Sequence, residues 1–155
     1  MKAATAKQIK DELKNRSTQE LLDLCLRLSR FKKENKELLT YLLFEIDDEE
    51  GYVRDIKYYI DESLEEVNSS NYYYLKKGIR KILREIKKYI RYSVKKESEV
   101  ELLLHFCEAI KPYIHRHYTI ENIFDRQLDM TARKIDKLHE DLQYDYGLEL
   151  ENIRG

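Results

Sequence analysis

The stretch Tyr74–Lys96, YLKKGIRKILREIKKYIRYSVKK, indicates the fold class of this chain. Apolar residues recur in it every three or four positions, a spacing that places them on one face of an α-helix. The apolar stripe consists of Leu75, Ile79, Ile82, Leu83, Ile86 and Ile90. At ~1.5 Å per residue the predicted helix spans roughly 35 Å, the full width of a small domain. The surrounding fold is therefore predicted to be helical.

The composition of the whole chain agrees with this reading. One proline and four glycines occur among 155 residues, whereas a β-protein needs many turns. Charged residues make up 38% of the chain, but the regular apolar spacing distinguishes it from a disordered one. We therefore predict an all-α fold of six or seven mostly antiparallel helices, arranged either as a bundle or as a short α-solenoid of helical hairpins.

A capping box at Ser17 and Glu20 opens a leucine-rich helix, because each residue can satisfy the backbone N–H of the other. The apolar positions of this helix are Leu21, Leu22, Leu24, Cys25, Leu26 and Leu28. A helix that is apolar over so much of its circumference should be covered on more than one side. The short joint at residues 30–35 predicts an antiparallel hairpin with the next helix.

The C-terminal half is predicted to contain two further long helices. Ser98 and Glu101 resemble a second capping box, and Pro112 ends or kinks the helix that follows. The last helix is expected to begin near Thr119 and to carry a heptad seam, which packs into the monomer or, less favoured, pairs with a second copy. Gly147 is predicted to end this last helix, because glycine is common just beyond a helix C-terminus. The predicted organisation is one helical domain, 1–147, and a C-terminal tail, 148–155.

The histidines and cysteines do not form a recognisable catalytic or metal-binding set. His115 and His117 are two residues apart, and so are His105 and Cys107, so on a helix the members of each pair face apart. No glycine-rich phosphate loop is present. We predict no catalytic, cofactor or metal site, and a protein that is not an enzyme.

Cys25 and Cys107 lie in separate apolar runs, which favours two small buried hydrophobes in a reducing compartment over a disulfide. The N-terminus lacks the apolar core of a signal peptide, and no run approaches the ~18 apolar residues of a membrane span. The predicted location is cytoplasmic, without membrane association.

The opening stretch also contains the one candidate site. Residues 71–96 hold ten Lys and Arg against a single acid, Glu85, interleaved with tyrosines. The candidate polyanion-binding or partner-binding residues are Lys77, Lys81, Arg84, Lys88, Arg91, Lys95 and Tyr73. Residues 45–66 hold ten acids against two bases. Two interpretations remain open: the acidic segment neutralises the basic helix, which is favoured, or the basic face is free to bind.

The predicted function is that of a non-enzymatic protein–protein interaction or scaffold module of the cytosol, with an unidentified protein partner or a second copy of the chain. The alternative is a nucleic-acid-binding protein that uses the basic outer face of the helix at 72–96. The two differ in salt dependence, because binding through phosphates weakens steeply as salt rises. The net charge of −1 gives no general attraction to nucleic acid.

Overall fold

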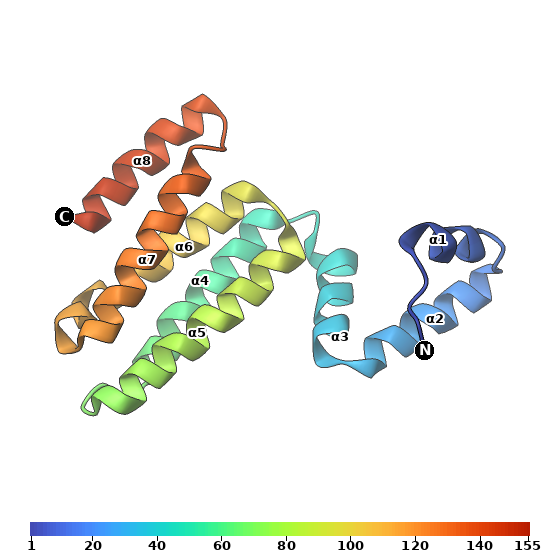
Figure 1. The fold of residues 1–155 in the computed structure, drawn as a ribbon, viewed down its shortest axis with the longest axis horizontal. Helices are drawn as coiled ribbons and strands as arrows, with labels where there is room; N and C mark the ends of the chain where they lie inside the picture. The colour runs from blue at the N-terminus through green and yellow to red at the C-terminus, as the bar shows by residue number, and fades with distance from the viewer. The chain divides into compact units, whose positions relative to one another are not determined.

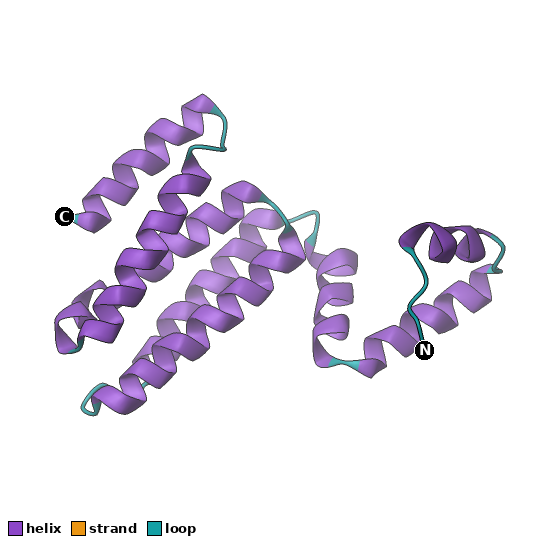
Figure 2. Ribbon diagram, in the orientation of Figure 1, coloured by secondary structure: helices purple, strands orange, loops and turns teal.

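The computed structural model describes residues 1–155 and is entirely helical, with no strand (Figures 1 and 2). The all-α prediction is confirmed, although the number of α-helices is eight rather than six or seven. The chain divides into two compact units, Met1–Phe44 and Glu45–Gly155. The helices are α1 (Ala6–Lys14), α2 (Thr18–Phe31), α3 (Lys33–Thr40), α4 (Glu49–Glu65), α5 (Tyr72–Ser93), α6 (Lys96–Ile110), α7 (Tyr118–Ile135) and α8 (Glu140–Arg154), with a π-helical turn at Tyr41–Glu45 and a 3-10 helix at Lys111–Arg116.

In the first unit, the capping box at Ser17 and Glu20 is confirmed, and a second one at Thr5 and Gln8 starts α1. The predicted antiparallel hairpin of α2 and α3 is wrong. Only Lys32 separates the two helices, and its extended backbone turns the chain through a corner (Figure 1). Because a corner does not lay two helices side by side, α3 leaves most of α2 uncovered.

The second unit is built around α6. Its buried residues are Ser98, Val100, Leu102, Leu103, Leu104, Phe106, Cys107 and Ile110. A helix that is apolar over most of its circumference is stable only when other helices cover it, and α6 packs against α4, α5, α7 and α8. A solenoid helix would contact only its immediate neighbours, so this unit is a bundle.

The α4–α5 hairpin matches the predicted pattern closely. Asn71 accepts a hydrogen bond from the backbone N–H of Tyr73 and so caps α5. The predicted stripe is buried at Leu75, Ile79, Ile82, Ile86 and Ile90. A Cβ atom at Gly78 would lie 2.5 Å from Cγ2 of Val67, so the glycine permits the close approach of the chain beyond α4 to α5.

The capping box predicted at Ser98 and Glu101 is wrong, because α6 begins three residues earlier than it implies, with Lys95 as its N-cap and no side-chain cap. The Ser98 hydroxyl instead donates to Oε1 of Glu49, at 2.5 Å, and Glu101 forms an ion pair of 2.6 Å with Lys57. Both residues join α6 to α4. Ser98 and Glu101 have the spacing of a capping box, but Ser98 already lies in the first turn of α6.

The prediction of a loose tail at 148–155 is also wrong. The last predicted helix is two helices, since α7 ends at Ile135 and α8 begins at Glu140. Gly147 lies in the middle of α8, and two of the residues that follow it, Leu150 and Ile153, are buried. The seam of α7 packs within the monomer as favoured, with Phe124, Leu128, Thr131 and Ile135 buried.

Replacing Gly147 with alanine is expected to raise the free energy of unfolding by about 0.5–1 kcal/mol, because alanine loses less backbone entropy in a helix. A Cβ atom there would meet no other atom within 4 Å. Thermal unfolding followed by circular dichroism measures the change. Gly78→Ala is the control and should give no such gain, since its Cβ atom would overlap Val67. A loss of stability in Gly147→Ala would contradict a continuous α8.

Candidate interaction surfaces

The first unit exposes its apolar side chains instead of burying them. None of the residues of α1, α2 and α3 is buried. The large apolar residues of these helices that are at least one-third exposed are Ile9, Leu13, Leu21, Leu22, Leu24, Leu26, Leu28, Phe31 and Leu38. They do not all share one face, because Leu22 and Leu26 lie about 100° or more of helical rotation from Leu21, at roughly 100° per residue. We call these nine residues the apolar surface.

One seam of α2 contains the two most exposed residues of the apolar surface. Leu21, Leu24, Leu28 and Phe31 are spaced three, four and three residues apart, as in the a and d positions of a coiled coil. Leu28 is 60% exposed and Phe31 is 76% exposed. Cys25, predicted to be buried, is exposed beside this seam.

The charges along α2 are divided between its two halves. Glu20 and Asp23 occupy the N-terminal half, and Arg27 and Arg30 occupy the C-terminal half. The one ion pair of α2 joins Glu20 to Arg16. Arg27 and Arg30 therefore form no ion pair within the chain. An antiparallel copy of the same helix would place each acidic half opposite a basic half.

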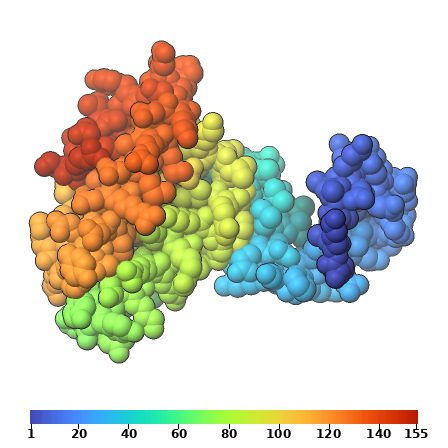
Figure 3. Space-filling view, viewed as in Figure 1, coloured from blue at the N-terminus to red at the C-terminus, as the bar shows by residue number.

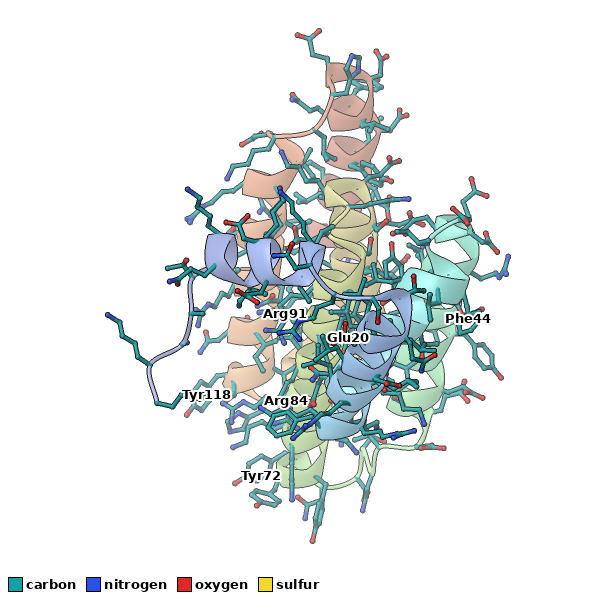
Figure 4. The ribbon with its side chains drawn as sticks, turned by 90° about the vertical axis from the view of Figure 1, so that its right-hand side faces the viewer. Glu20, Phe44, Tyr72, Arg84, Arg91 and Tyr118 are labelled. Carbon is teal, nitrogen blue, oxygen red and sulfur yellow. The ribbon has the colours of Figure 1, made fainter.

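The second surface is the basic helix α5. Four of the seven predicted residues, Lys77, Lys81, Arg84 and Arg91, are exposed and form no ion pair within the chain. Figure 4 labels Arg84 and Arg91 on this helix. Tyr73 is exposed and meets Tyr74 edge to face, with ring centroids 5.4 Å apart. The acidic segment at 45–66 therefore does not neutralise these four cations by direct pairing.

The other two predicted residues have different surroundings. Lys88 is buried, with its Nζ atom 2.7 Å from Oε2 of Glu85 and over the ring of Tyr89. Lys95 lies beyond the end of α5 and pairs with Glu49 at 3.5 Å. The seven residues thus do not form one continuous stripe, since Lys88 is buried and pairs with Glu85 of its own helix, and Lys95 pairs with Glu49 of α4.

A groove of about 590 Å³ lies between α5 and α7, which are neighbours on the face shown in Figure 3. Arg80 and Lys87 of α5 and Arg126 of α7 line it, and no acidic residue does. Partial burial lowers the pKa of Lys87 below its ordinary value, and the positive charges of Arg126 and Lys134 lower it further, while Glu99 opposes them. We call this site the basic groove.

Gln127 belongs to the wall of the basic groove and is 3% exposed. Its side-chain oxygen, Oε1, is buried without a hydrogen-bond partner, the one such buried side-chain atom in the structure. An unsatisfied buried polar group costs about 1–3 kcal/mol, so most are paired with protein or water. The basic groove therefore contains an unused hydrogen-bonding side chain beside three cations.

Aromatic rings lie at one end of the basic groove. Tyr118, which is 69% exposed, lines the groove, and its ring lies 4.4 Å from that of His117. His117 in turn stacks on Tyr72, with centroids 4.9 Å apart and planes 3° from parallel. Figure 4 labels Tyr72 and Tyr118, the outer rings of this row. Such exposed rings are surfaces on which flat ligands stack.

The sequence pattern does not predict the basic groove. Arg80 and Lys87 are two of the ten cations at residues 71–96, and Arg126 and Gln127 carry no local signal. The periodicity of α7 predicts which of its faces is buried, but not that its neighbour is α5. The groove depends on that long-range packing.

Cys107 and His105, the cysteine and histidine of α6, both take part in the packing of the second unit. Burial raises the pKa of the Cys107 thiol to about 12, which keeps the thiol protonated and unreactive at neutral pH. His105 Nε2 lies 2.9 Å from a carboxylate oxygen of Asp61 and joins α6 to α4. No group of three or more His, Cys, Asp and Glu side chains is arranged to hold a metal ion.

Glu149 on α8 gives a pH-dependent prediction. Desolvation raises the pKa of this carboxyl, with Glu108 and Glu101 adding to the shift and Lys57 and His105 opposing it. A raised pKa in the folded state means that ionisation of Glu149 lowers stability as pH rises. Glu149→Gln should therefore raise the free energy of unfolding at pH 7 by a few tenths of a kcal/mol, because solvent screens the site. The difference in stability between the variant and the unaltered chain should vanish at a pH below 4.5, the ordinary pKa of the carboxyl. Urea unfolding at pH 7 and at a pH below 4.5 measures this difference. An equal gain at the two pH values would contradict a raised pKa of Glu149.

None of the helices is both long and apolar enough to cross a membrane. Comparisons with protein-family models, with curated proteins and with solved structures find no match for this chain.

Proposed function

We propose that this protein is a non-enzymatic interaction module of the cytosol that associates with a second copy of itself through the apolar surface. The observation that carries the proposal is that three helices in sequence bury no side chain while exposing nine large apolar ones. Exposed apolar side chains gathered along a helix face mark interaction sites, and the seam of Leu21, Leu24, Leu28 and Phe31 is such a face. The two free cysteines agree with a reducing compartment.

A second copy is the partner that the charges favour. In a symmetric dimer, residue i of one chain meets residue j of the other and the reverse. An antiparallel pairing of α2 with its copy would place Leu21 against Phe31 and Leu24 against Leu28. The same pairing brings the acidic half of each α2 to the basic half of the other, so hydrophobic and electrostatic complementarity agree.

Sedimentation velocity over a range of protein concentrations tests this proposal. A concentration-dependent shift from monomer to dimer is the expected result. A monomer at every concentration would overturn self-association, and the apolar surface would then have to bind a different protein.

Nucleic-acid binding by the basic outer face of α5 is the second candidate function. It is favoured by one observation, that Lys77, Lys81, Arg84 and Arg91 are exposed without ion pairs. Binding of a labelled oligonucleotide should weaken at least about tenfold between roughly 50 and 200 mM salt. It should also be lost in a Lys77→Glu/Lys81→Glu/Arg84→Glu variant. Binding that the variant retains would exclude this face.

A further inference from the structure

We propose that the basic groove between α5 and α7 binds the phosphate groups of a nucleotide, either free or within a single strand. The groove differs from the outer face of α5 in its residues and in its position. Arg80, Lys87 and Arg126 line it, whereas Lys77 and Lys81 line a separate groove on the α4 side, together with Glu66. The two sites can therefore be tested separately.

The electrostatics of the basic groove favour an anion. Three cations line a groove that has no acidic residue on its walls. Lys87 is partly desolvated, and the positive charges of Arg126 and Lys134 oppose its own. Of these four cations only Lys134 has an ion-pair partner, Glu99 at 2.7 Å. A phosphate would relieve this repulsion and accept hydrogen bonds from the guanidinium groups, which match its geometry.

Two further features favour a nucleotide over a simple inorganic anion. The Oε1 atom of Gln127 is buried without a donor, and rotation of this side chain into the groove would let a ribose hydroxyl or a base amine supply one. The exposed ring of Tyr118 lies on the same groove and can stack on a base. The volume of about 590 Å³ falls within the range of ordinary small-molecule sites.

The test is isothermal titration calorimetry of the full chain at roughly 50 mM salt, with ATP, pyrophosphate and a single strand of about 12 nucleotides. ATP or the strand should bind, and the tighter of the two identifies the source of the phosphate. Pyrophosphate should bind more weakly, because it has neither the ring nor the additional donors. Equal affinity for pyrophosphate and ATP would contradict nucleotide recognition, and no binding of ATP or strand would overturn the proposal.

Matched charge removals locate the site. Lys87→Gln/Arg126→Gln should weaken binding about tenfold or more, while Lys7→Gln/Lys10→Gln, with the same loss of charge at exposed positions of α1, should change it less than about threefold. Equal weakening in both pairs would show a diffuse electrostatic effect and overturn the assignment. Gln127→Leu should weaken ATP binding while the protein stays folded by circular dichroism, and unchanged affinity would exclude Gln127 from the site.

Discussion

Replacing Phe106 with alanine is expected to lower the free energy of unfolding of the second unit by about 3–5 kcal/mol, which is a large share of the ~5–15 kcal/mol that stabilises an ordinary domain. Phe106 is fully buried in α6, the helix that contacts α4, α5, α7 and α8. The substitution removes apolar surface from the core and leaves a cavity that the surrounding helices cannot fill without moving.

Urea unfolding followed by circular dichroism measures this loss. Tyr144→Ala is the control, because Tyr144 is 70% exposed on α8 and its truncation should change stability by less than about 0.5 kcal/mol. If Phe106→Ala cost less than about 1 kcal/mol, α6 would not be the centre of the bundle.

Replacing Leu28 and Phe31 together with glutamate is expected to abolish self-association while leaving the second unit folded. Both side chains lie on the seam of α2 and are among the most exposed apolar residues of the first unit. In an interface, four carboxylates would be buried per dimer, and each unpaired buried charge costs several kcal/mol. In the monomer the same residues face water and cost little.

Sedimentation of this double variant should therefore show a monomer at concentrations at which the unaltered chain is a dimer. Lys7→Glu/Lys10→Glu on α1 is the control, because it introduces two glutamates at exposed positions outside the seam. A dimer that survives Leu28→Glu/Phe31→Glu would place the interface elsewhere.

The helices of the α4–α5 hairpin could be predicted because their stripes are local. The spacing of Ile79, Ile82 and Ile86 depends only on the helical repeat, and the structure buries all three. The end of the chain could not be predicted in the same way. Gly147 has the residue type of a helix stop, but the burial of Leu150 and Ile153 keeps α8 helical beyond it.

The candidate sites also combine features that the sequence predicts with features that depend on long-range packing. The pattern of α2 predicts that its many apolar residues need a cover, but it does not say whether that cover belongs to the same chain. The same pattern predicts that Cys25 is buried, and this prediction is wrong, because Cys25 is exposed. The basic groove depends on the packing of α7 beside α5, two helices separated by all of α6, so no local pattern contains it.

The most direct test of self-association through α2 is the rate at which a maleimide labels Cys25 at about 1 µM and at about 100 µM protein, a range that spans ordinary dimer affinities. Cys107 gives no background in the folded protein, because it is buried and its thiol pKa is raised to about 12. Slower labelling of Cys25 at the higher concentration, and equal rates in Leu28→Glu/Phe31→Glu, are the predicted results. Equal rates at both concentrations in the unaltered chain would contradict the account, because α2 would then remain exposed to solvent.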